Sequence, residues 1–123
     1  MRFEPALVTG TLLRRYQRFK ADVRMDDGTT VTAHVANTGS MRGCMVRGGR
    51  VALSHHPDRG RKLEYSWELS HVDGVWVCVN TWRPNRIVEE ALEDGRLGPL
   101  RGYPHIRREV RHGERSRMDF FLE

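Results

Sequence analysis

The chain has 123 residues and a mass of 14.3 kDa, which allows one domain, or a small domain plus part of a neighbour. Its 21 Lys and Arg exceed its 16 Asp and Glu, which gives a formal charge of +5, and 38% of its residues are hydrophobic. This composition indicates a globular chain rather than a disordered one. No apolar run approaches the roughly 20 residues of a membrane helix, and the first residues lack the apolar core of a signal peptide. We therefore expect neither a spanning nor a secreted protein.

Two cysteines, Cys44 and Cys78, are too few for a disulfide scaffold, and neither belongs to a C-x-x-C pair. We expect both to be buried free thiols of a cytoplasmic protein. The six histidines show none of the spacings typical of a metal site. No nucleophile motif marks a catalytic serine or thiol.

Positive charge is concentrated in the first half of the chain. Up to Lys62 there are 12 basic and 5 acidic residues, and after it 9 basic and 11 acidic. All but two of the basic residues are Arg, whose planar guanidinium suits phosphate contacts, although an Arg-rich proteome would give the same bias without any function. The first half is therefore the candidate electrostatic surface.

The same half alternates apolar and polar residues with the period of β-strands. The first strand is expected to bend or bulge at Gly10, and Asp27-Gly28 and Asp73-Gly74 supply hairpin turns. The predicted strands span residues 6–13, 19–25, 30–35, 51–54, 65–69 and 75–79. Five or six short strands over residues 1–82 predict a small closed barrel, so the fold class is mainly β with a small α/β tail.

The tail, residues 83–123, predicts a helix and a hairpin. Asn85 can cap the helix and Gly95 can end it. Strands at 106–111 and 115–122 follow, joined at His112-Gly113. These elements are too few to bury a core. We expect the incomplete start of a second domain, which can self-associate through its uncovered apolar faces. The helix face comprises Ile87, Val88, Ala91 and Leu92, and the strand face comprises Met118, Phe120 and Leu122.

Basic and aromatic residues alternate at the end of the first strand. The four cations Arg14, Arg15, Arg18 and Lys20 surround the rings of Tyr16 and Phe19. This pattern is typical of barrel surfaces that neutralise phosphates and stack bases, but a solvated strand edge with inward rings would read the same.

Two loops add candidate phosphate contacts. The polar loop from Asn37 and Thr38 to Arg42 and Gly43 could present backbone amides and a guanidinium to a phosphate, or be only a turn. The cluster formed by Arg59, Arg61 and Lys62 lies in a predicted loop, where a run of charge is usually just a solvated surface.

Glu90 on the helix and Asp119 on the last strand are the acidic residues that could converge on a divalent metal. Asp119 alternates with Met118 and Phe120 and therefore lies on the face opposite that apolar set. As an isolated pair they could equally be surface acids.

Several short blocks, in order and spacing, together resemble the first half of the sugar fermentation stimulation protein A family. These blocks are RYQRFKADV at 15–23, NTGSM at 37–41, Gly43-Cys44, Arg61-Lys62, WEL at 67–69, VNT at 79–81, Asn85-Arg86, EAL at 90–92 and ERSRMDF at 114–120. Ala36 stands where members usually have Pro. The resemblance implies an OB-fold barrel followed by a restriction-endonuclease-like domain, and DNA binding linked to sugar (maltose) metabolism genes.

By position, the resemblance makes Asp119 the first strand-borne metal acid of the nuclease-like domain and Glu90 the helix glutamate near it. The Glu-Val-Lys motif that follows in the family is absent from this sequence. These two acids are thus an incomplete catalytic pair, and Mg²⁺ or Mn²⁺ would be used only if other residues completed the site.

The sequence therefore predicts a module that binds double-stranded DNA with weak sequence specificity and without a cofactor. The predicted contacts are Arg14, Arg15, Arg18, Lys20, Asn37, Thr38, Arg42, Arg61 and Lys62. Two alternatives stay open: a metal-dependent nuclease whose active site is completed by residues absent from this chain, and a barrel that binds a protein or a small ligand.

Overall fold

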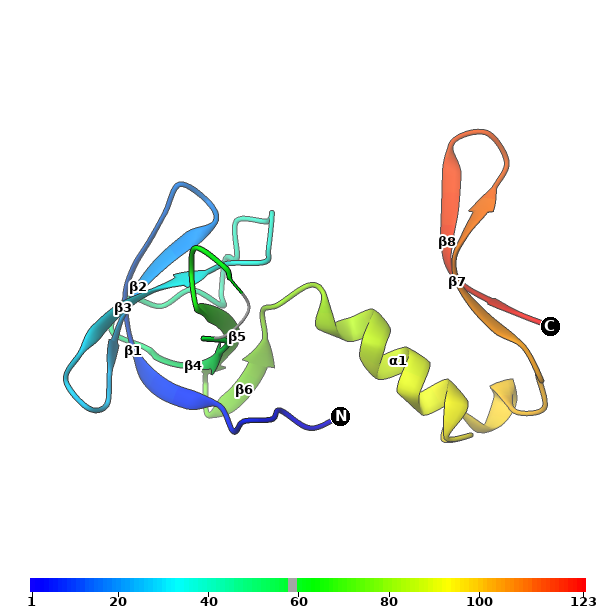
Figure 1. Cartoon of the computed structure of the whole chain (residues 1–123), viewed down its shortest axis with the longest axis horizontal. Coiled ribbons are helices and arrows are strands. Elements are labelled where there is room, and N and C mark those ends of the chain that lie inside the picture. The colour runs from blue at the N-terminus through cyan, green and yellow to red at the C-terminus, as the bar shows by residue number, and fades with distance from the viewer. Residues whose placement is uncertain (58–59) are drawn as a thin grey trace. The chain divides into compact units, whose positions relative to one another are not determined.

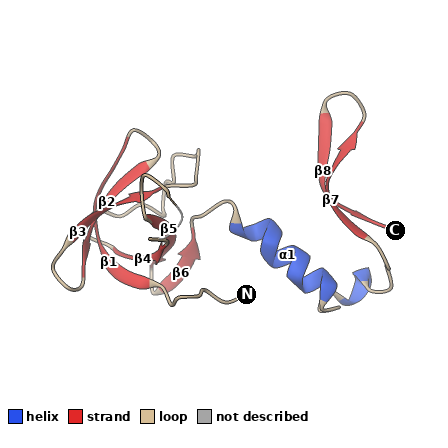
Figure 2. Ribbon diagram, in the orientation of Figure 1, coloured by secondary structure: helices blue, strands red, loops and turns tan. Residues whose placement is uncertain are grey.

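The computed structural model describes residues 1–57 and 60–123, and the chain clusters into two units, residues 2–81 and residues 82–123 together with Met1. The first unit is built from strands, and the second from a helix and a hairpin (Figure 1, Figure 2). The strands of the first unit are β1 (Val8–Tyr16), β2 (Lys20–Met25), β3 (Thr30–His34), β4 (Arg50–His55), β5 (Tyr65–Val72) and β6 (Val75–Cys78). The second contains α1 (Arg83–Glu93), a 3-10 turn (Gly98–Leu100), β7 (Ile106–His112) and β8 (Ser116–Leu122).

Strands β1 to β5 close into a barrel. The sheet order is β3-β2-β1-β4-β5-β6, and a parallel pairing of β3 with β5 joins the two ends of the first five strands. Strand β6 is an additional strand that pairs antiparallel with β5. This connectivity is that of an OB fold, so the predicted mainly β barrel is confirmed.

The core lies inside the barrel because the inward residues of each strand are apolar. On β2 and β3, Ala21, Val23 and Ala33 are fully buried, as the alternation predicts. Phe19, expected to continue that dry face, is instead 45% exposed because it precedes β2 in the turn at the barrel end. The core residues are Leu12, Ala21, Val23, Met25, Ala33, Val35, Met41, Val51, Leu53, Trp67 and Val79.

Strand β1 is irregular, but at a different place from the one predicted. Its register with β2 shifts between Leu12 and Arg14, so the bulge lies there and not at Gly10. Gly10 is required for another reason: a Cβ at this position would lie 2.7 Å from the carbonyl oxygen of Arg24. The glycine allows close strand packing, and the bulge redirects the basic end of β1.

In the second unit, α1 begins at Arg83, and the predicted Asn85 cap is wrong. Trp82 precedes the helix without a side-chain cap, and Pro84 occupies the first turn, where its fixed φ favours the helix. Gly95 does end the helix, with φ 65° and its N–H donating to Leu92 O. Strands β7 and β8 form the predicted hairpin.

No residue of 82–123, a range described throughout, is buried. On α1, Ile87 and Val88 are 45% and 37% exposed, and Met118 on β8 is 44% exposed. An ion pair between Glu89 and Arg108, 3.0 Å long, connects α1 with β7. These three members of the predicted apolar faces are thus exposed, whereas Ala91, Leu92, Phe120 and Leu122 are half-buried.

The two thiols differ in their environment. Cys44 is half-buried, whereas Cys78 is exposed on β6, the last strand in the sheet order. The expectation of two buried thiols is therefore wrong for Cys78. Among the described residues, no helix has the length and apolar character needed to cross a membrane.

Candidate nucleic-acid interface

One row of register partners crosses the outside of the barrel at its basic end. Tyr16 lies opposite Lys20, Lys20 opposite His34, and His34 opposite Ser66. The β1–β2 turn (residues 17–19), the β3–β4 loop (35–49) and the β4–β5 loop (56–64, described except for 58–59) therefore meet at this end. In OB folds, the loops between strands 1 and 2 and between strands 4 and 5 take part in oligonucleotide binding.

The β1–β2 turn has an unusual backbone conformation. Gln17 and Arg18 both adopt left-handed φ angles, 49° and 63°, which non-glycine residues rarely adopt. Phe19 N donates to Gln17 O at 2.7 Å, which closes the turn. Such strain persists only where the surroundings hold it in place.

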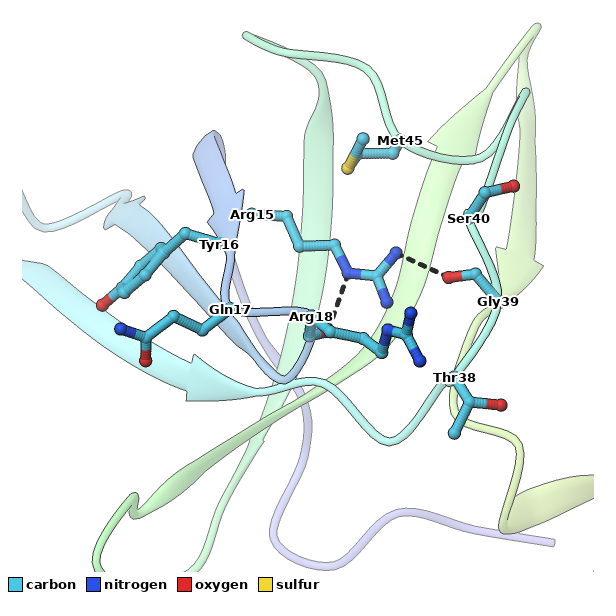
Figure 3. Close-up of a pocket in the computed structure, with 8 residues that line it drawn as sticks. All are labelled: Arg15, Tyr16, Gln17, Arg18, Thr38, Gly39, Ser40 and Met45. Carbon is cyan, nitrogen blue, oxygen red and sulfur yellow. Dashed lines mark hydrogen bonds between the residues drawn. The ribbon is translucent and has the colours of Figure 1, made fainter.

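Arg15 holds this turn against the β3–β4 loop (Figure 3). Its Nε donates to Arg18 O at 2.9 Å, and its two terminal nitrogens donate to Gly39 O and Asn37 O, both at 2.8 Å. Burial, with a smaller contribution from Arg18, lowers the pKa of Arg15. Arg15, predicted as a phosphate contact, thus acts chiefly as a bracket between two loops.

Asn37 and Met41 fix the β3–β4 loop from within. The Asn37 carboxamide accepts from Gly39 N at 2.9 Å and donates to Val79 O at 3.0 Å. Met41 is buried in the barrel core. The polar pattern of the loop identified Asn37, but the anchoring role of Met41 was missed, since a lone methionine in a polar loop gives no periodic signal.

These contacts create a cleft of about 360 Å³ at the barrel end (Figure 3). Of the predicted contacts, Arg15, Arg18 and Thr38 line it. Arg42 is exposed on the same loop as Thr38. No carboxylate of the described residues pairs with Arg18 or Arg42. The cleft is lined by Arg15, Tyr16, Gln17, Arg18, Thr38, Gly39, Ser40 and Met45.

Arg14 lies on the outer face of β1, and its charge is already paired. Its Nε donates to Asp22 at 2.8 Å, and its guanidinium lies 4.2 Å from the centre of the Tyr16 ring. The hydrogen bond from Arg14, the largest cause, lowers the pKa of Asp22. Strand alternation places Arg14 and Arg15 on opposite faces, and the bulge between Leu12 and Arg14 sets which of them lies on the outer face with Asp22.

The β4–β5 loop brings a second set of cations to the row of register partners. Arg61 Nη2 donates to Ser66 Oγ at 2.9 Å, and Ser66 lies opposite His34. Burial first, and the Arg61 charge second, lower the pKa of His34. Arg61 therefore lies near Lys20, the register partner of His34. Lys62 is exposed on the same loop, and Arg59 lies outside the described residues.

Three exposed apolar residues accompany these cations. Phe19 in the β1–β2 turn, and Met45 and Val46 in the β3–β4 loop, are 45%, 41% and 49% exposed. The sequence pattern singled out Phe19 as an aromatic neighbour of the cations but not the other two, because Met and Val in a short segment are equally typical of a core.

The acidic pair forms no comparable site. The Glu90 carboxylate forms an ion pair with the Met1 α-amino group at 2.8 Å, and this contact lowers the pKa of Glu90. Asp119 is exposed on β8. The described residues contain no group of three His, Cys, Asp or Glu side chains placed to hold a metal ion.

Comparisons with known proteins match both units. Residues 13–79 match the family described as SfsA N-terminal OB domain, and residues 82–123 match the sugar fermentation stimulation protein RE domain. The chain is similar to the sugar fermentation stimulation protein homologs of Geobacter metallireducens, 56% identical over 100% of this chain and 53% of that protein, and of Thioalkalivibrio sulfidiphilus, 55% identical over 100% and 52%.

A solved structure supports the same assignment. The structure of Pyrococcus furiosus SfsA in complex with Ca²⁺ superposes with a TM-score of 0.83 and 29% identity, covering 100% of this chain and 51% of that one. The chain thus spans about half the length of the relatives it matches. Because the family match extends over both units in order, the chain belongs to the sugar fermentation stimulation protein (SfsA) family.

Proposed function

We propose that the basic end of the barrel binds DNA through its phosphates. The observation that carries this proposal is the convergence of the β1–β2 turn and the β3–β4 and β4–β5 loops. Their cations Arg18, Lys20, Arg42 and Lys62 have no carboxylate partner among the described residues. Cations that are not neutralised within the protein can displace the counterions of a polyanion, and this release drives association.

The contacts divide into two roles. Arg18, Lys20, Arg42 and Lys62 would neutralise phosphates, whereas Arg15 and Asn37 would keep the cleft in shape. Phosphate contacts carry no base information, so we expect weak sequence specificity. A role at sugar metabolism genes would then require further determinants. Equal affinity for such a promoter and for a scrambled duplex is the expected result.

Salt dependence of duplex binding tests the proposal. The affinity should fall steeply with salt, with a slope of about 0.9 per phosphate contact in a log–log plot. The double variant Arg18→Ala/Arg42→Ala should weaken binding and lower the slope by about 2. Fluorescence anisotropy at several salt concentrations measures both quantities.

Arg24→Ala/Arg50→Ala provides the matched control. It also removes two positive charges, but from the opposite end of the barrel. There Arg24 on β2 lies opposite Thr30, and Arg50 at the start of β4 is paired with Asp26 at 2.6 Å. The control should leave the salt slope unchanged. No binding of duplex or single-stranded DNA near 50 mM salt, or an equal loss in both variants, would overturn the proposal.

The metal-dependent nuclease remains the alternative, and the residues of this chain do not fit it on their own. The solved relative holds Ca²⁺, but here the described acidic residues form no cluster of three, and the Glu90 carboxylate is engaged with the Met1 α-amino group. Chelation with EDTA at constant ionic strength should leave DNA affinity unchanged, and a loss would point to a metal in the interface.

A further inference from the structure

The basic end of the barrel also exposes apolar surface that phosphate binding does not use. Phe19, Met45 and Val46 are 45%, 41% and 49% exposed, whereas the core residues of the closed barrel are buried. Met45 lines the cleft together with Arg18, and Phe19 follows Arg18 directly in the chain. Apolar and cationic groups are thus interleaved on one surface.

Backbone hydrogen bonds hold these side chains outward. Phe19 N donates to Gln17 O at 2.7 Å, and Phe19 O accepts from Val35 N at 2.8 Å. Met45 N donates to Met41 O at 3.1 Å, and Met41 is buried in the core. The exposed positions are therefore built into the turn and the loop.

Duplex DNA exposes few groups that can pack against such apolar surface. Its base faces are stacked inside the helix, so a protein meets phosphates, sugars and base edges. An unpaired strand exposes base faces, which aromatic and apolar side chains can cover while nearby cations contact the backbone. The Thr38 side chain and Ser40 line the same cleft (Figure 3) and can hydrogen-bond base edges or phosphate oxygens.

We propose that this surface binds single-stranded DNA in preference to duplex, with the Phe19 ring and Met45 covering unpaired bases beside Arg18. The inference rests on the proposed function, since it needs the same cations, and adds the class of DNA. Phe19 is then a binding residue whose contribution comes from its π-face.

The test compares one sequence of about 12 nucleotides, within the site size of one OB fold, as a labelled single strand and as a duplex. The intact chain should bind the single strand at least about fivefold more tightly, the lower limit of what one stacked base contributes. Phe19→Leu keeps an apolar side chain and should abolish most of this preference. Phe19→Trp should preserve it.

Trp76→Leu is the matched control. Trp76 lies on β6, is 44% exposed and does not line the cleft. It should leave single-strand affinity unchanged. As a second readout, a 2-aminopurine base in the strand should lose fluorescence on binding to the wild type and to Phe19→Trp, but less on binding to Phe19→Leu.

The outcomes separate the two proposals. Salt-dependent duplex binding that equals or exceeds single-strand binding would overturn this inference and leave the proposed function standing. Absence of binding to either form would overturn both. Tighter binding of the matching RNA strand, or an unchanged preference in Phe19→Leu, would also overturn the assignment.

Discussion

The Asn80 side-chain amide donates to both carboxylate oxygens of Glu68, at 3.1 and 3.2 Å, inside the protein. Glu68 is fully buried on β5, and the Ser54 hydroxyl also donates to it at 2.7 Å. Beside Asn80, Thr81 N donates to Ala36 O at 2.9 Å. The buried carboxylate thus connects the β4–β5 pair with the segment that leaves the barrel.

Asn80→Ala should destabilise the barrel by about 1–3 kcal/mol, because it removes a hydrogen-bond donor from a buried polar group. Asn80→Asp should cost more, since it replaces the donating amide with a second buried carboxyl group. Urea unfolding followed by circular dichroism measures the change. Glu64→Gln, at a position where the side chain is 52% exposed, is the control and should have little effect. An unchanged midpoint in Asn80→Ala would contradict the structural role given to this network.

Arg15→Lys should make the two loops that form the cleft more mobile without changing the net charge of the protein. A lysine ammonium cannot reproduce the planar fork that reaches the carbonyls of Arg18, Asn37 and Gly39. Losing two of these hydrogen bonds should cost about 1–3 kcal/mol. Hydrogen exchange should increase in the β1–β2 turn and the β3–β4 loop, and DNA affinity should fall.

Arg18→Lys is the charge-matched control for that experiment, because the Arg18 side chain lines the cleft without a carboxylate partner among the described residues. It should leave exchange unchanged. If Arg15→Lys behaved like this control, the bracket role of Arg15 would be wrong.

Acid should weaken the ion pair between Asp26 and Arg50. Hydrogen bonds from Arg50, the largest cause, and from Thr9 lower the pKa of Asp26 below its ordinary value. A lowered folded-state pKa stabilises the protein above the unfolded-state value of about 3.9, and this contribution is lost as the pH falls toward the folded-state pKa. Asp26→Asn should therefore flatten the pH dependence of stability below about pH 4. Equal acid sensitivity in the variant, measured by urea unfolding, would count against this assignment.

The exposed apolar side chains of residues 82–123 should make the chain self-associate as its concentration rises. Exposed apolar surface favours contact with another surface, which removes it from water. Analytical ultracentrifugation should show a rising average mass, which Ile87→Glu lowers. Glu93→Gln, an exposed position on the same helix, is the control. A monomer at all concentrations would contradict the prediction.

Local patterns determined much of this architecture from the sequence alone. Alternation placed β2 and β3, because adjacent side chains on a strand point to opposite faces, and Gly95 ended α1, because glycine readily adopts a left-handed conformation. The interleaving of Arg18 and Lys20 with rings identified the basic end of the barrel. The resemblance of ordered short blocks identified the family.

Tertiary structure decided which role each of these residues has. Arg14 and Arg15 are adjacent and chemically identical, yet one pairs with Asp22 and the other spans two loops. Alternation puts them on opposite faces of β1, but the bulge formed in the pairing with β2 decides which of them faces Asp22. Glu68 occupies a polar position of an alternating strand and is nevertheless buried. Its burial is compensated by hydrogen bonds from Ser54 and Asn80, which belong to other segments of the chain. Such partners are set by contacts between distant segments, which no local periodicity encodes.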